Sequence, residues 1–227
     1  MAACDKDALI IPVEKAIAAE MPVVMIDSGL STPVYDAFLS TNNIPVGANC
    51  ADVLVNLIGG AGKIGIINFA TGTSTTIDRE IGFINQIESK YPNIEIVGIQ
   101  YCDSDPIKVA NQATDMIVAE SDLKDLWGVN DQATIGVVNA VSVLNKVREI
   151  FVVGFDNSAD IIAGLKSRTI QGTAVQMPTV MGSEGVQTII DILNGTPPDS
   201  KEVDTGVVMV TLDNFNDEVS QAAPFII

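Results

Sequence analysis

The chain has 227 residues, with 12 basic and 29 acidic side chains, no histidine and a formal net charge of −17. A negative field of this size repels phosphate backbones and anionic lipids, so nucleic acids and membrane surfaces are disfavoured as partners. The lack of histidine excludes Ser-His-Asp and Cys-His catalysis and removes the commonest zinc ligand.

Short apolar runs alternate with longer helical patterns along the chain. Most of these runs are apolar throughout, which is typical of parallel strands covered on both faces. We expect strands at 22–26, 37–41, 63–69, 94–100, 126–129, 149–155 and 171–176, and helices near 5–20, 45–57, 75–90, 106–119, 131–145, 158–167 and 178–194. This alternation predicts an α/β fold with doubly wound parallel sheets.

The first helical pattern, residues 5–20 with a kink expected at Pro12, has no strand before it. A crossover helix needs a strand on each side, and residues 2–4 are long enough only for the tail of one. We therefore expect the chain to begin inside a strand–helix unit, with an amino-terminal portion missing. The alternative is that this helix packs as an ordinary terminal cap.

Planar polar side chains follow nearly every predicted strand, at the edge where open α/β sheets bind ligands. Arginine donates pairs of hydrogen bonds, aspartate accepts them, and the amides do both. Such groups suit a neutral polyhydroxylated ligand, and an aromatic face can cover the C–H side of its ring. No activated nucleophile accompanies them, so we expect no catalytic residue, no metal and no cofactor. The residues are Asp27, Asn43, Arg79, Asn130, Phe155, Asp156 and Gln176.

Each polar group also has a plainer interpretation. Asp27 and Asp156 could cap the helices that follow them, and Asn130 could be a helix N-cap. Arg79 could be a surface residue paired with a neighbouring acid. The stretch 72–75 (GTST) could hold a phosphate, but it lacks the lysine and the spacing of phosphate-binding loops.

Six motifs occur here in an order and spacing that resemble one family: PVVMID, STNNIPVG, DREIGF, GVNDQATIG, FVVGFDNS and GTAVQMP. They resemble the type I periplasmic sugar-binding proteins of the ribose-binding branch, which share a fold with the effector domains of LacI-type repressors. The resemblance covers essentially the whole chain. It implies that Asp27, Asn43, Arg79, Asn130, Asp156 and Gln176 bind sugar hydroxyls and that Phe155 lines the pocket.

Three departures from the family pattern are visible. Ser104 stands where ribose binders place an aromatic residue, and Ser28 stands where an arginine often follows the first aspartate. Both changes put ribose itself in doubt as the ligand. The family also begins with about three more strand–helix units. The resemblance thus implies an incomplete first lobe at 1–41 plus 177–205 and a second lobe at 42–176 plus 206–227.

The function that this resemblance implies is the solute-binding component of an ABC-type sugar importer, shortened at its amino terminus. Its partners would be a monosaccharide or polyol and, in the full-length protein, the importer's membrane subunits. That protein would be extracytoplasmic, either periplasmic or membrane-anchored. The first residues of this chain are acidic and do not have the pattern of a signal peptide. The exposed, incomplete lobe predicts self-association as a homodimer.

Two other functions stay open. The effector-binding domain of a LacI-type transcription regulator would need a helix-turn-helix headpiece upstream. An enzyme with a doubly wound fold would need a cofactor loop or a catalytic base that the chain does not offer.

Overall fold

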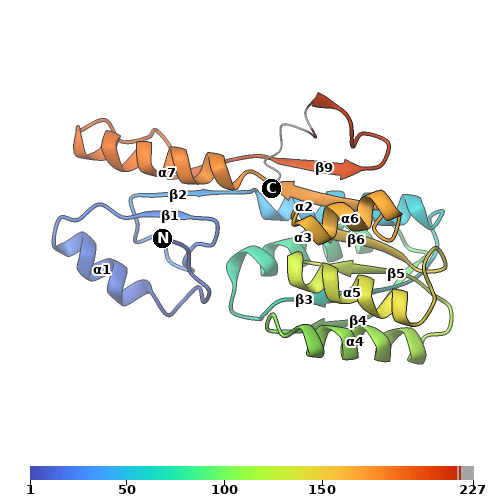
Figure 1. The fold of residues 1–227 in the computed structure, drawn as a ribbon. Coiled ribbons are helices and arrows are strands. Elements are labelled where there is room, and N and C mark those ends of the chain that lie inside the picture. Colours follow the sequence, from blue (N-terminus) through green and yellow to red (C-terminus); the bar gives the residue numbers. More distant parts are fainter. Residues whose placement is uncertain (219, 221–227) are drawn as a thin grey trace.

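Two separate sheets organise the chain, of which a computed structural model describes residues 1–218 and 220 (Figure 1). The small sheet has the order β1-β2-β8, formed by Val24–Ile26, Ala37–Ser40 and Glu202–Asp204. The large sheet has the order β4-β3-β5-β6-β7-β9, formed by Ile94–Tyr101, Gly62–Asn68, Leu123–Gly128, Phe151–Phe155, Gly172–Gln176 and Val207–Thr211. β9 pairs antiparallel with β7, and the other strand pairs are parallel. The predicted α/β fold with parallel sheets is confirmed.

Helices cover both faces of the large sheet. Buried strand residues alternate between the two faces, so Leu126 packs in one apolar core and its neighbour Trp127 in the other. Trp127 stacks on Phe83, with ring centroids 4.3 Å apart. We call this sheet with its helices the large lobe. One face carries α2 (Asn43–Leu57) and α3 (Ser74–Lys90); the other carries α4 (Pro106–Ala119), α5 (Asp131–Val143) and α6 (Ala159–Ser167).

The small sheet has one helix on each face, α1 (Ile10–Ala18) and α7 (Pro178–Leu193) (Figure 1). Residues 1–3 run alongside β1: the Met1 amino group donates to Val24 O at 2.7 Å, and Ile26 N donates to Met1 O at 2.8 Å. These bonds extend the sheet by a short strand-like segment, as expected for the tail of a strand at 2–4. We call this sheet with α1 and α7 the small lobe.

The helices α2 and α3 approach each other closely because two glycines face across their contact. A Cβ on Gly47 would lie 1.9 Å from Arg79 O, and a Cβ on Gly82 would lie 1.9 Å from Ile44 O. Both distances are far shorter than any van der Waals contact, so only glycine fits at these positions. The close approach fixes the backbone of Arg79 relative to the start of α2.

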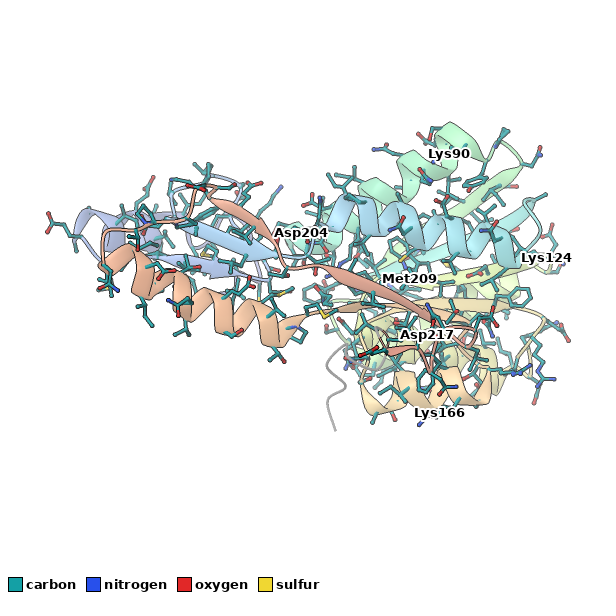
Figure 2. The ribbon with its side chains drawn as sticks, turned by 90° about the horizontal axis from the view of Figure 1, so that it is seen from above. Lys90, Lys124, Lys166, Asp204, Met209 and Asp217 are labelled. Atoms are coloured by element: carbon teal, nitrogen blue, oxygen red, sulfur yellow. The ribbon has the colours of Figure 1, made fainter. Side chains whose placement is uncertain are left out.

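The chain passes between the lobes three times: between β2 and α2, between β7 and α7, and between β8 and β9. Asp204, the last residue of β8, lies near the narrow connection, and Met209 in β9 lies over the large lobe (Figure 2). The lobe boundaries expected from the resemblance stay a prediction. Of the range 206–227, residues 219 and 221–227 lie outside the described residues.

Some predicted elements differ in their bounds. α1 begins at Ile10 rather than near residue 5, because the Asp5 carboxylate accepts from the backbone N–H of Asp7 and Ala8 and forms a turn there. Pro12 falls in the first turn of α1, where a missing N–H costs no hydrogen bond, so it does not interrupt the helix.

β8 and β9 were not among the strands expected from apolar pattern, and β5 begins at Leu123, earlier than the predicted 126. Polar Lys124 and Asp125 interrupt the apolar run of β5 and hide its start. Within the described part of the chain, no helix combines the length and the apolar character needed to cross a lipid bilayer.

Candidate functional site

Asp27 and Asp156 occupy equivalent places at the carboxyl ends of strands in different lobes. Each continues its ladder by one residue: Asp27 N donates to Leu39 O at 2.9 Å, and Asp156 N donates to Ala174 O at 2.8 Å. Both have left-handed backbones, with φ of 62° and 71°. Aspartate tolerates this conformation better than most side chains, though non-glycine residues there are uncommon.

Neither aspartate is a helix cap in this structure. Ser158 occupies the N-cap position of α6, without a side-chain capping bond, and the Asp156 carboxylate accepts from Gln176 Nε2 at 2.7 Å. Asn130, by contrast, does cap α5, because its Oδ1 accepts from Ala133 N at 3.0 Å. The capping interpretation therefore holds for Asn130 and not for the two aspartates.

Arg79 is buried rather than on the surface, with only 3% of its area exposed. Its Nε donates to Asn43 Oδ1 at 2.7 Å, its Nη1 to Val129 O at 3.0 Å, and its Nη2 to Gln176 Oε1 at 3.0 Å. The guanidinium carbon lies 3.6 Å from the centre of the Phe155 ring, a cation–π contact. Four contacts from four different segments thus hold this side chain in one orientation.

Gln176 links the two charged groups through the opposite ends of its amide. Its Oε1 accepts from Arg79 and also from Thr41 Oγ1 at 3.2 Å, while its Nε2 donates to Asp156. Asn43 Nδ2 donates to Thr41 O at 2.8 Å and closes the network. Because Thr41 and Gln176 both stand where the chain passes between lobes, the network spans two of the three connections.

A cavity of about 280 Å³ lies beside this network, between the two lobes. Five of the seven predicted residues line it: Asp27, Arg79, Asn130, Asp156 and Gln176. Ser28 and Ser104, where the sequence departs from the family pattern, line it too. A larger hollow of about 690 Å³ is lined by residues such as Leu57, Lys124 and Phe151 and includes none of the predicted residues.

Asn43 and Phe155 are not among the residues that line this cavity. Asn43 is buried and uses its side chain to hold Arg79, and Phe155 is 0% exposed beneath the guanidinium. The expectation that Phe155 forms an exposed wall therefore differs from its placement, because its side chain points into the core shared by β6 and α2. Both residues hold Arg79 in place from the side that faces away from the cavity.

Phe69 lines the cavity and was missed by the sequence reasoning. It directly follows the last residue of β3, at the same edge of the sheet as Asp156. Its position at the end of a predicted strand is the signal that marks it in the sequence. The missing aromatic at Ser104 is thus accompanied by an aromatic from a neighbouring strand end.

The charges around the cavity interact with one another. Burial raises the pKa of Asp27; the positive charge of Arg79 opposes this shift, and the negative charge of Asp156 adds to it. Burial lowers the pKa of Arg79, but Asp156 and Asp27 oppose the change, and a guanidinium stays protonated at neutral pH. The cavity therefore combines one fixed cation with carboxylates that repel each other.

Comparison with known proteins identifies the family. Residues 1–197 match the family described as periplasmic binding protein domain. The chain belongs to this family. The predicted resemblance to the type I periplasmic sugar-binding proteins is confirmed.

Relatives of this periplasmic binding protein domain include the ribose import binding protein RbsB of Bacillus subtilis, 27% identical over 191 residues, which are 84% of this chain and 61% of the relative. RbsB of Escherichia coli is 25% identical over 87% of this chain and 66% of its own length. The chain thus spans less than two thirds of these curated relatives.

Similar solved structures include solute-binding proteins of transporters. One from Agrobacterium vitis, with bound D-fucose, has a TM-score of 0.94 and 34% identity and covers 99% of this chain and 78% of its own. One from Agrobacterium radiobacter, in complex with D-arabinose, has a TM-score of 0.92 and 30% identity; the match covers 98% of this chain and 76% of that structure's chain.

Proposed function

We propose that this periplasmic binding protein domain binds a monosaccharide or polyol as the solute-binding part of an ABC-type importer. The observation that carries the proposal is the hydrogen-bonded series Arg79–Gln176–Asp156 beside a cavity, with Asp27 contributed by the other lobe. Paired acceptors and amides suit the hydroxyls of a sugar, each of which both donates and accepts. No step of covalent chemistry is required.

The named ligands of the relatives support this class of ligand. Their names and titles mention ribose, D-allose and xylitol among the curated proteins, and D-fucose, D-arabinose and tagatopyranose among the solved structures. All of them are polyhydroxylated and uncharged. Transport proteins, rather than regulators, provide these names, which favours the importer over the LacI-type effector domain.

Three finer points belong to the same proposal. The full-length protein would be extracytoplasmic, and its lobes would close over the ligand before it meets the membrane subunits. The small lobe would mediate self-association, because α7 exposes Val186 (63%), Ile190 (44%) and Leu193 (68%) on one face. Light scattering that gives a monodisperse monomer would contradict the self-association.

The test of ligand binding is calorimetric titration of pentoses, hexoses and polyols into the 227-residue chain and into Asp27→Asn and Asp156→Asn variants. Loss of a charged hydrogen-bond acceptor should weaken binding roughly tenfold or more, without a large change of shape. Asp160→Asn, an exposed acid outside the cavity, is the matched control and should bind like the parent. Absence of binding for every sugar and polyol would overturn the proposal.

A further inference from the structure

The two ends of the molecule carry apolar surface with charges of opposite sign, and neither end belongs to the cavity between the lobes. The parallel strands of the large sheet present their carboxyl ends to that cavity, so their amino ends lie at the far end of the large lobe. Lys124, near the start of β5, lies at this far end, whereas α7 extends to the opposite end of the molecule and finishes at Leu193 (Figure 2).

The hollow of about 690 Å³ lies at the far end of the large lobe, and we call it the end hollow. It is formed by the last residues of α2 and α4, the segment after α5 and the first residues of β5 and β6. Val118 in its wall is 69% exposed, so part of this apolar surface faces solvent. Its apolar lining includes Leu57, Ile58, Val118, Leu144 and Phe151.

The rim of the end hollow carries positive charges that the protein itself leaves without a salt bridge. Two acids line the hollow, Glu120 and Glu149, and each is bound by a lysine, at 2.7 and 2.5 Å. Lys124 and Arg148 line it as well; both are exposed, and neither forms a salt bridge within the described part of the chain. A surface that docks here would therefore meet apolar walls and two cations that are available to pair.

The opposite end of the molecule has the complementary pattern. Met21 and Leu193 are 59% and 68% exposed, and together with Glu20 and Asp36 they line a hollow of about 310 Å³ in which no lining residue is basic. We call these four residues the small-lobe tip. Asp36 accepts one bond from the backbone N–H of Val23, at 2.7 Å, and neither acid forms a salt bridge among the described residues. The tip thus presents apolar side chains beside two acids.

The charge of the small lobe disfavours contact between two tips. Residues 1–41 and 177–205, which contain this lobe, carry 3 basic and 11 acidic side chains. A symmetric contact between two tips would bring Glu20 and Asp36 of both copies together, and like charges across an interface are unfavourable. The cations of the end hollow would instead pair with these acids, in the usual arrangement of an apolar interface core with a polar rim.

We propose that the protein associates head to tail, with the small-lobe tip of one copy seated in the end hollow of the next. The apolar side chains of the tip contact the walls of the hollow, and its two acids face Lys124 and Arg148. The inference rests on the proposed self-association of the small lobe and names the surface that receives it. Because two different surfaces meet, each contact leaves one tip and one hollow free, so the assembly can grow longer as the concentration rises.

The first test is sedimentation velocity on the 227-residue chain. We expect the average mass to rise over a roughly hundredfold range of protein concentration. Association should weaken several-fold between about 50 and 500 mM salt, because salt screens the charges at the rim of the contact. Association that is unchanged or stronger at high salt would overturn the pairing of these charges.

Two variants separate the two surfaces. Lys124→Glu places an acid in the end hollow, and Leu193→Asp replaces an apolar side chain of the tip with an acid; each should weaken self-association about tenfold or more. Lys90→Glu reverses an exposed charge of the large lobe outside the hollow, and Ile107→Asp changes a side chain that is 73% exposed and lies outside both surfaces. Both controls should associate like the parent, and circular dichroism would check that all four variants are folded.

Mixing the two variants tests the head-to-tail geometry directly. Leu193→Asp keeps an intact hollow and Lys124→Glu an intact tip, so an equimolar mixture should form a one-to-one complex that neither variant forms alone. A mixture that stays monomeric would overturn the inference.

The remaining outcomes distinguish this inference from the proposed function. If Lys124→Glu associates like the parent while Leu193→Asp does not, the tip docks elsewhere, and the inference falls while self-association through the small lobe stands. A parent chain that stays monomeric would overturn both. Sugar titrations of the same variants test the importer function independently, because neither substitution lies at the cavity between the lobes.

Discussion

The two lobes differ in how much of the site they hold and how firmly they hold it. The large lobe buries two apolar cores, one on each face of a six-stranded sheet, and contributes Arg79, Asn130, Asp156 and Gln176 to the cavity. The small lobe has a three-stranded sheet and leaves part of α7 exposed, and from the predicted set it contributes Asp27 alone.

This difference indicates that the large lobe determines the geometry of the binding site. The polar groups of the large lobe are tied to one another by hydrogen bonds, whereas Asp27 receives no strong bond from a neighbouring side chain. We expect substitutions in the large lobe to disturb both stability and binding. Equivalent substitutions in the small lobe should change stability little.

The largest expected effect is that of Gly47→Ala in the large lobe. A methyl group there would meet Arg79 O at 1.9 Å and force α2 and α3 apart, so we expect the free energy of unfolding to fall by about 3 kcal/mol. Urea unfolding followed by circular dichroism measures it. Gly182→Ala in α7 of the small lobe is the control: apart from its chain neighbours and its own helix backbone, no atom lies within 4 Å of the added Cβ, and alanine should stabilise the helix by about 0.5–1 kcal/mol. Equal effects of the two changes would contradict the close approach of α2 and α3.

Gln176→Ala should have the next largest effect. It leaves Arg79 Nη2 and Asp156 Oδ1 without their partner, which should destabilise the protein by about 2 kcal/mol and weaken sugar binding. Its counterpart in the small lobe is Gln187→Ala, which removes an exposed bond to Asp191 and should cost less than about 0.5 kcal/mol. Thermal unfolding of the two variants side by side compares the lobes directly.

The smallest expected effect is a gain in stability, because it removes an unfavourable buried charge from the large lobe. Asp125 in β5 is fully buried, and among the described residues no side chain bonds to its carboxylate; only the adjacent backbone N–H of Leu126 favours its ionised form. Asp125→Val replaces it with an apolar group of similar size and should stabilise the protein by about 1–2 kcal/mol at pH 7.

The same residue predicts a pH dependence. Burial raises the pKa of Asp125 well above its usual range, so the folded state binds a proton that the unfolded state releases. Its contribution to stability is complete below the unfolded pKa of about 3.9 and is lost as the pH rises through the folded value. Unfolding measured from pH 4 to pH 8 should show a smaller decline for Asp125→Val. An unchanged decline would mean that another group causes it.

Much of the fold could be predicted because parallel strands buried on both faces leave a plain apolar signal. β8 was not predicted because it is three residues long and carries two acids. The start of β5 was hidden by Asp125, an acidic residue buried without a side-chain partner. The local sequence pattern does not indicate that an aspartate at this position is buried. Only the packing of the folded large lobe buries that side chain.

The candidate site was predictable to the extent that carboxyl ends of parallel strands meet at one edge. That rule brings Asp27 and Asp156 to one cavity, but it does not say which side chains face the ligand and which face the core. Phe155 follows the alternation of Val153, and both point into the core beneath α2. The partners of Arg79 come from four segments far apart in sequence, so only the folded chain reveals them.

The amide of Gln176 has one further consequence, which concerns the entropy of binding. Its oxygen accepts from two donors and its nitrogen donates to a carboxylate. With the amide reversed, its nitrogen would face the two donors and its oxygen would face the carboxylate. The side chains of the large lobe are therefore ordered before any ligand arrives, and association would restrict few of their rotamers. Differences in affinity between ligands would then report chiefly on the ligands themselves and on the movement of the small lobe.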